Sequence, residues 1–285
     1  MVNVNNACVW YESLGFDLTG TRLEQIRDYL GYKLLNPGTP EGAAWENGTA
    51  NEDAYYAASD GAGFGLIAEE MKKLSSDKLP RGTLRDLLRG PLVPSDQTPD
   101  NSDPRNKFVE LEMAAHCSRA GFKLLGFDDL TFKFEGVEYQ VECKRPFRAK
   151  ALERRTSEAY KQLSPKLKRD DSRGLIAIAV EKVYNLDRNF QTVRSKSDIS
   201  GIGLKVADKF RTDTEKLHWQ WVDHRIVGVV AIIRFLVKIE DSHAAGPSYN
   251  SILVMRASPE AGQAADSSRL NRMVQQLNSG SSLPS

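Results

Sequence analysis

An alternating run of residues near the middle of the chain constrains the fold more than any other feature. The run Val137-Glu-Tyr-Gln-Val-Glu-Cys-Lys144 alternates apolar and polar side chains with a period of two. Successive side chains of a β-strand point to opposite faces, so this period predicts a strand with one core face and one polar face. Glu142 and Lys144 then lie side by side on the polar face. A carboxylate that can hold a divalent cation is thereby placed next to an ammonium group that can orient a water molecule.

The residues before this run predict a partner strand. Asp129 leads into the segment Leu130-Thr-Phe-Lys-Phe134, and Glu135-Gly136 fits a turn between two strands. A hairpin of this kind could bring Asp129 back beside Glu142. Because the oxygen ligands of Asp and Glu favour Mg²⁺ or Mn²⁺ over softer metals, the hairpin predicts a metal site along one of its sides.

The rest of the chain predicts an α/β fold, in which a mixed β-sheet is flanked by helices and preceded by an N-terminal helical region. The unbroken apolar run Gly174–Val180 has the length and composition of a strand that is buried on both faces. Gly121 is expected to end the helix before the hairpin. Further helices are expected at 23–35, 66–74, 83–88, 107–120, 148–167, 203–221 and 268–277, and further strands at 122–125, 225–237 and 251–255.

Composition shifts divide the chain into three parts. Residues 1–104 form a helical region of unknown role, 105–257 form the core, and 258–285 form a polar C-terminal tail. A stretch with four prolines and several Ser, Asp and Asn residues, 91–104, is expected to link the first two parts. The glycine-rich segments 61–65 and 201–203 are expected to be loops or helix ends, because neither has the spacing of a dinucleotide-binding loop.

The charge distribution says more about partners than the net charge of +1 does. Residues 41–70 contain seven acidic side chains and no Lys or Arg, whereas residues 144–173 contain eleven Lys and Arg against four Asp and Glu. A local positive excess of this size favours an anionic partner. Within it, Arg145, Arg148 and Lys150 follow the alternating strand and are candidates for contacts with phosphates.

Cysteine usage and hydropathy predict a cytoplasmic protein. Three cysteines without a Cys-x-x-Cys pair indicate neither a disulfide framework nor a structural zinc site. The N-terminus has no signal-peptide pattern, and the longest apolar run, Ile226–Ile233, is far too short to span a bilayer. We therefore expect no contact with a membrane.

In the order of its polar residues the sequence resembles the PD-(D/E)xK nuclease superfamily, the fold of many restriction endonucleases and Holliday-junction resolvases. Glu142-Cys143-Lys144 matches the (D/E)-x-K motif, and Asp129 lies thirteen residues upstream of Glu142. Glu110 occupies the preceding helix, and Gln162 occupies the following one, where several family branches carry a glutamine. The resemblance covers about residues 105–182. It does not cover the first hundred residues.

Two positions in this motif stay open. Glu110 and Glu112 both lie on the first helix, about 200° apart around its axis, so only one of them can face the site. Glu110 lies eleven residues before Gly121, as the helix glutamate does in resolvase-like members, so the resemblance favours Glu110. Asp128 stands where the family name has proline, and either Asp128 or Asp129 could serve as the hairpin carboxylate; Asp129 has the better spacing.

The resemblance implies a Mg²⁺-dependent endonuclease, most simply one that acts on DNA in defence or repair. Its metal ligands would be Asp129, Glu142, the backbone carbonyl of Cys143 and Glu110. Lys144 would position and activate the attacking water, and the side chain of Cys143 is expected to face the core. The alternative is a non-catalytic nucleic-acid-binding or scaffold protein that retains the fold. A homodimer is compatible with either.

Overall fold

The computed structural model of the chain describes residues 2–36, 38–47, 51–93, 103–127, 130–167, 171–187, 190–218, 223–241, 244–255 and 262–279. The chain divides into two compact units. The first unit comprises Met1–Ala115, Leu186–Lys196 and Phe235–Ser248. The second unit comprises His116–Asn185, Ser197–Arg234 and Tyr249–Ser285.

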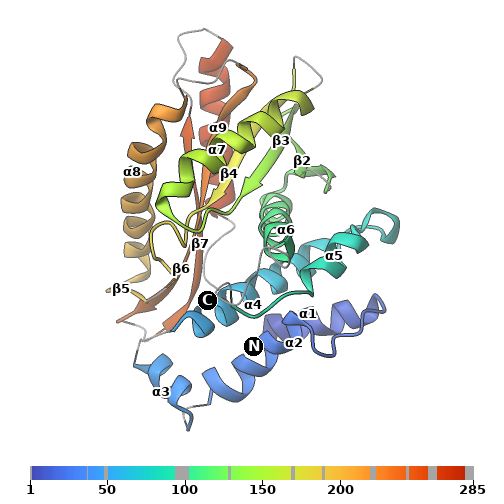
Figure 1. Cartoon of the computed structure of the whole chain (residues 1–285), viewed down its shortest axis with the longest axis vertical. Helices are drawn as coiled ribbons and strands as arrows, with labels where there is room; N and C mark the ends of the chain where they lie inside the picture. Colours follow the sequence, from blue (N-terminus) through green and yellow to red (C-terminus); the bar gives the residue numbers. More distant parts are fainter. Residues whose placement is uncertain are drawn as a thin grey trace. The chain divides into compact units, whose positions relative to one another are not determined.

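The first unit is mainly helical and is built around one long helix (Figure 1). That helix, α4, is buried on nearly all sides, and α1, α2 and a short π-helix pack against it. Thr21, Thr39 and Asn51 each cap the N-terminus of a helix through a side-chain oxygen, as hydroxyl and amide side chains commonly do. The helical elements of this unit are α1 (Val2–Ser13), α2 (Arg22–Asp28), the π-helix (Tyr29–Leu34), α3 (Pro40–Glu46), α4 (Glu52–Met71), a 3₁₀ turn (Ser76–Lys78), α5 (Arg81–Leu87) and most of α6 (Asp103–Arg119).

The glycine-rich segment 61–65 lies inside α4, so the prediction of a loop or helix end there is wrong. The physical reason is close packing. A Cβ atom on Gly63 would lie 2.6 Å from the ring of Phe108, and one on Gly65 would lie 2.7 Å from Cβ of Asn3. These glycines let α6 and α1 approach the backbone of α4, and here that outweighs the helix-breaking tendency of glycine. The segment 201–203 lies at the N-terminal end of a helix that begins at Ile199, which agrees with the expected helix end.

A buried ion triad also joins the helices of the first unit. Oδ2 of Asp60 on α4 accepts hydrogen bonds from Arg22 on α2 and from Arg105 on α6, each at 2.7 Å. All three residues are buried. The guanidinium of Arg22 also lies 4.7 Å from the ring centre of Phe108. A buried carboxylate of this kind is tolerated because two cations and several hydrogen bonds compensate for its lost hydration.

The chain contains a seven-stranded mixed sheet in the order β1-β2-β3-β4-β6-β5, with β7 paired to β6. Strands β1, β2 and β3 are antiparallel, whereas β3, β4 and β6 run parallel and form the buried centre of the second unit. In the first unit, β5 pairs with the end of β6. The strands are β1 (Lys123–Gly126), β2 (Leu130–Phe134), β3 (Val137–Lys144), β4 (Arg173–Ala179), β5 (Gln191–Val193), β6 (Ile226–Ile239) and β7 (Ala244–Met255).

The predicted hairpin is confirmed as β2 and β3. Phe134 pairs with Val137 and Leu130 pairs with Val141. The two turn residues between them, Glu135 and Gly136, have φ values of 45° and 83°. Two successive left-handed residues are what a two-residue turn of type I′ requires, because its twist matches that of the flanking strands. The alternation of β3 is also confirmed, since Tyr139, Val141 and Cys143 are buried.

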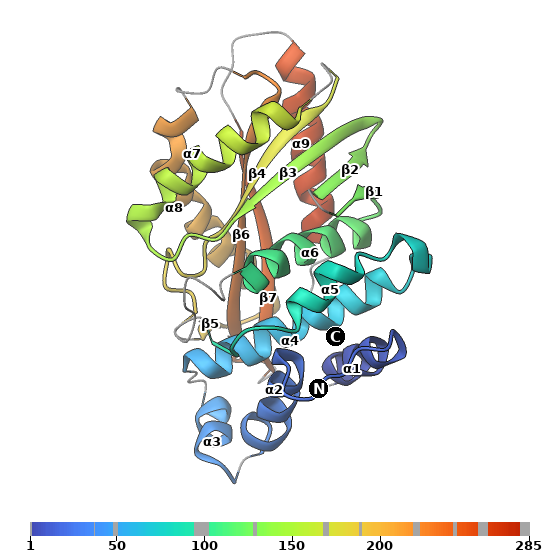
Figure 2. The ribbon, with the colours of Figure 1, turned by 45° about the vertical axis from the view of Figure 1, so that its right-hand side comes forward.

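Helices cover both faces of the central strands in the second unit (Figures 1 and 2). Helix α7 (Leu152–Leu163) lies along β3 and β4 on the face that carries Glu142 and Lys144. Helix α9 (Gly262–Ser279) lies on the opposite face, where Asp266 accepts a hydrogen bond from Arg173. Helix α8 (Ile199–His218) packs beside α7. Short 3₁₀ turns occupy Ala149–Ala151, Ser164–Lys166 and Lys196–Asp198.

The predicted fold class is therefore correct: the chain is α/β, with a mixed sheet flanked by helices and additional N-terminal helices. The prediction missed α1, α3, β5 and residues 52–65 of α4. Most of the predicted linker at 91–104, namely residues 94–102, lies outside the described residues, and the three-part division at 104 and 257 stays a prediction. In the part of the chain that the model describes, none of the helices is long and apolar enough to cross a membrane.

Candidate active site

Strand β3 places Glu142 and Lys144 as the alternation predicts. Both side chains lie on the face opposite to the buried Cys143, and they are 11% and 18% exposed. The ammonium Nζ of Lys144 donates to Oε1 of Glu142 at 2.6 Å. The two groups therefore form a partly buried ion pair at the end of the strand, within reach of solvent.

Helix α7 and the turn after it add two more side chains to this pair. Nζ of Lys144 also donates to Oε1 of Gln162 at 2.6 Å, and Nζ of Lys166 donates to Oε2 of Glu142 at 2.9 Å. Gln162 and Lys166 are four residues apart, the spacing that brings side chains to the same side of a helix. We call Glu142, Lys144, Gln162 and Lys166 the β3–α7 cluster.

Lys166 is the member of this cluster that the sequence reasoning missed. It lies in the basic stretch after β3, residues 144–173. Its spacing from Gln162 was the available signal. With two ammonium groups and one carboxylate, the cluster carries a net charge of one positive, which favours an anion next to it.

A polar clamp fixes the end of α7 against the start of β6. The carboxylate of Asp223 accepts a hydrogen bond from Ser164 at 2.6 Å and ion-pairs with Arg225 at 2.8 Å. The backbone N–H of Asp223 donates to the hydroxyl of Tyr160. The hydrogen bond from Arg225, together with the one from Ser164, outweighs burial and lowers the pKa of Asp223 to about 2. This clamp holds the segment that carries Lys166.

Arg145 has an internal partner, which does not match its predicted role as a phosphate contact. Its Nε donates to Oε1 of Glu181 at 2.9 Å, and Arg234 donates to the same oxygen at 2.7 Å. The three side chains are 0–3% exposed. Burial raises the pKa of Glu181, but the charges of Arg234 and Arg145 outweigh it and hold the pKa at about 2. Arg148 and Lys150, the other two predicted phosphate contacts, are exposed.

Only part of the predicted metal site lies among the described residues. Asp128 and Asp129 lie outside them; Leu130, the residue after Asp129, pairs with Val141, the residue before Glu142. In the described ranges no group of three or more His, Cys, Asp or Glu side chains could hold a metal ion. The Glu142 carboxylate is a hard oxygen donor of the kind that Mg²⁺ and Mn²⁺ accept. The other carboxylates of the predicted site are Asp129 or Asp128 and Glu110 or Glu112.

The two candidate glutamates on α6 have different surroundings. Glu112 is 4% exposed and faces α4, where a Cβ on Gly63 would lie 2.8 Å from its Oε1. Glu110 is 22% exposed, and its Oε2 lies 3.6 Å from Nζ of Lys107. Burial against α4 leaves Glu110 as the better candidate. Both belong to the first unit and Glu142 to the second, so a joint site stays a prediction.

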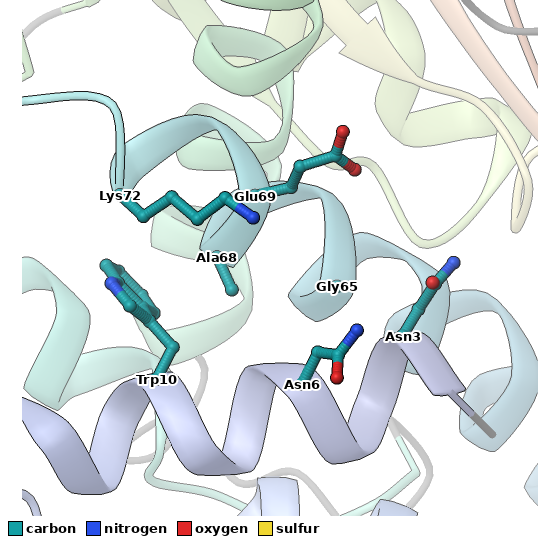
Figure 3. Close-up of a pocket in the computed structure, with 7 residues that line it drawn as sticks. All are labelled: Asn3, Asn6, Trp10, Gly65, Ala68, Glu69 and Lys72. Atoms are coloured by element: carbon teal, nitrogen blue, oxygen red, sulfur yellow. The ribbon is translucent and has the colours of Figure 1, made fainter.

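The first unit also contains a small surface cavity of about 110 Å³ between α1 and α4. Figure 3 shows two amide side chains and an indole from α1 facing α4 across it. None of the predicted site residues lines it. Its lining residues are Asn3, Asn6, Trp10, Gly65, Ala68, Glu69 and Lys72.

The sequence matches no protein-family model, and a search of curated proteins found no match either.

Proposed function

We propose that this protein is a metal-dependent endonuclease that hydrolyses phosphodiester bonds, with DNA as its substrate and defence or repair as its role. One observation carries the proposal. Glu142 and Lys144 lie side by side on β3, and Gln162 of α7 accepts a hydrogen bond from the same lysine. These hydrogen bonds join three of the polar side chains of the predicted site, at the end of a strand that runs parallel to its neighbour β4. Ligands of open α/β sheets commonly bind at this end.

In this proposal Glu142 is a ligand of Mg²⁺ or Mn²⁺, with the Cys143 carbonyl, Asp129 and Glu110 as the other protein ligands. When bound, the ion would polarise the scissile phosphate and offset its negative charge. Lys144 is placed to orient the attacking water and to stabilise the charge that develops on the phosphate. The hydrogen bond to Gln162 restricts the rotamers of Lys144, which keeps its ammonium on the site side of the strand.

Lys166 has two roles in this proposal. Without a metal, its ammonium pairs with Glu142 Oε2 and compensates for the partial burial of that carboxylate. A divalent ion on Glu142 would repel both lysines. Lys166, the more exposed of the two at 34%, would then contact a phosphate oxygen of the substrate.

One observation favours a second function. Both oxygens of Glu142 are paired with lysines, so the cluster is already a cationic site for a phosphate without a metal. A non-catalytic nucleic-acid-binding or scaffold protein would need no more than this. The first function predicts catalytic cleavage of nucleic acid, whereas the second predicts binding without cleavage.

The cellular compartment of the protein does not distinguish between the two functions. Cys8, Cys117 and Cys143 are all buried and free, which fits the cytoplasm that we propose for the protein.

The test is a cleavage panel of single-stranded, duplex and branched DNA and of RNA, each with Mg²⁺, Mn²⁺ or EDTA. We expect cleavage that depends on the metal, and we expect Lys144→Ala to abolish it while circular dichroism and nucleic-acid binding stay nearly unchanged. Lys133→Ala is the matched control, because Lys133 is an exposed lysine on the neighbouring strand β2. Undiminished cleavage by Lys144→Ala would exclude this site. Binding without cleavage of any substrate would support the second function.

A further inference from the structure

An exposed aromatic residue lies shortly after strand β3 in the chain, between the strand members and the helix members of the β3–α7 cluster. Phe147 lies three residues after Lys144 and is 42% exposed. Three residues of chain span at most about 10 Å, so the backbone of Phe147 lies close to the end of β3 that carries Lys144. Single exposed apolar side chains are common and by themselves show nothing. What distinguishes Phe147 is the way in which it is supported.

The ring of Phe147 rests on a charged side chain that is fixed from beneath. The guanidinium of Arg145 lies 5.2 Å from the ring centre, within the range of a cation–π contact. Arg145 is held in turn by Glu181 at 2.9 Å, and Glu181 is held by Arg234 at 2.7 Å. Buried ion pairs are poor sources of stability but hold their partners in a specific geometry. Here the ion pairs hold Arg145 in the position in which it contacts the exposed ring of Phe147.

The surroundings of the ring are cationic. Arg148 and Lys150 are exposed, and neither makes an ion pair with any carboxylate among the residues that the model describes. Two exposed cations within three residues of an aromatic ring in the chain favour a polyanion that also carries planar groups. Single-stranded nucleic acid meets both requirements, because its bases are unpaired and stack on aromatic side chains while its phosphates contact Lys and Arg. A duplex keeps its bases stacked on one another, out of reach of such a ring.

We propose that Phe147 is a base-stacking platform, and that the site therefore binds a single-stranded or unpaired segment of nucleic acid next to the bond that is cut. This inference rests on the proposed nuclease function for the cutting, but the stacking itself can be measured without it. The occupant is an unpaired nucleobase, with Arg148 and Lys150 on the adjoining phosphates.

The experiment measures binding by the full chain in EDTA, where no metal-dependent cleavage occurs. Labelled single-stranded DNA, single-stranded RNA and duplex DNA of equal length are titrated at several salt concentrations. Phe147→Leu keeps an apolar side chain but removes the aromatic face, and we expect it to weaken single-stranded binding about tenfold or more. Phe147→Trp should bind at least as tightly as the wild type. The added indole should be quenched when a base stacks on it, relative to the four native tryptophans.

Two controls separate stacking from charge and from general packing. Phe147 carries no charge, so Phe147→Leu should leave the dependence of affinity on salt unchanged, whereas Arg148→Ala should reduce the slope by about one. Leu125→Ala removes an equally exposed apolar side chain from β1 and should not change binding. Duplex affinity should change little in Phe147→Leu.

Equal affinity of Phe147→Leu and wild type for single strands would overturn the inference, and so would an equal loss for duplex and single strands. The comparison of DNA with RNA shows which backbone the site prefers. Metal-dependent cleavage together with an unaffected Phe147→Leu variant would refute the platform alone. Loss of single-stranded binding in that variant, in a protein that cleaves no substrate, would support the platform and refute the nuclease.

Discussion

The buried triad beneath the candidate site gives the sharpest prediction about stability. Glu181 is fully buried between Arg145 and Arg234, and both arginines donate to its Oε1. Glu181→Gln keeps the shape of the side chain and removes its charge. Two buried guanidinium groups would then share a region of low dielectric constant without the anion that compensates them.

The expected loss of unfolding free energy in Glu181→Gln follows from the pKa of Glu181. Burial raises that pKa, but Arg234 and Arg145 outweigh it and lower the pKa from 4.5 to about 2. A difference of about 2.5 pH units between the folded and unfolded states corresponds to about 3 kcal/mol of stability at neutral pH. Loss of one partner from a buried ion pair typically costs about 3–5 kcal/mol, so the two routes agree.

The lowered pKa of Glu181 also determines how its contribution to the unfolding free energy depends on pH. Because the folded-state pKa lies below the unfolded value, folding favours the ionised carboxylate of Glu181. Its contribution is complete above pH 4.5 and is lost as the pH falls from 4.5 to about 2. Glu181→Gln has no such group, so the difference in unfolding free energy between wild type and variant should shrink by about 2 kcal/mol between pH 7 and pH 3.

The assay is urea unfolding followed by tryptophan fluorescence and far-ultraviolet circular dichroism at pH 7, 5, 4 and 3. Glu138→Gln is the matched control, because Glu138 is a carboxylate on β3 without an ion pair in the described residues. Its unfolding free energy should change by less than about 0.5 kcal/mol. A loss below about 1 kcal/mol for Glu181→Gln at pH 7, or a loss independent of pH, would refute the reasoning.

Two further predictions concern other charged groups. Lys166→Ala removes an ammonium 2.9 Å from Glu142 Oε2, so calorimetry should find Mn²⁺ bound up to about tenfold more tightly while cleavage slows. Lys161→Ala removes an exposed lysine of α7 and should change neither, and unchanged Mn²⁺ affinity in the first variant would contradict the assigned role. Asp60→Asn leaves two buried arginines without their anion and should cost about 3–5 kcal/mol in urea unfolding. Asp86→Asn, in an exposed ion pair, should cost less than about 1 kcal/mol, and similar losses for the two variants would show that the buried triad contributes no more than a surface pair.

The sequence was most informative where one periodicity determined the structure. Strand β3 alternates strictly, its turn needs two left-handed residues and offers Glu135-Gly136, and β4 is apolar after Arg173 because both of its faces are covered. Patterns of this kind depend on neighbouring residues in the chain, so they predict the local structure without knowledge of tertiary contacts. They were enough to place Glu142 and Lys144 on one face and α7 after them.

The sequence prediction failed for a helix that is buried on nearly all sides. Helix α4 is buried on nearly every side, so it shows no apolar stripe, and its glycines are typical of loops until the neighbouring helices are known. Helix α1 was missed for another reason. Its buried side chains Val4, Ala7, Cys8 and Tyr11 have helical spacing, but the polar asparagines between them hid the pattern. The partner of Arg145 could not be predicted, because Glu181 lies thirty-six residues later and meets it only through the pairing of β3 with β4.

That pairing connects the two proposals physically. Lys144 and Arg145 are consecutive, so they point to opposite sides of the chain: the first into the β3–α7 cluster and the second into the triad with Glu181 and Arg234. An arginine that is locked on one side limits how far the lysine on the other side can shift, and it supports the ring of Phe147 two residues later. Loosening the triad should therefore weaken both cleavage and single-stranded binding. Changes within the cluster alone should affect cleavage and leave stacking intact.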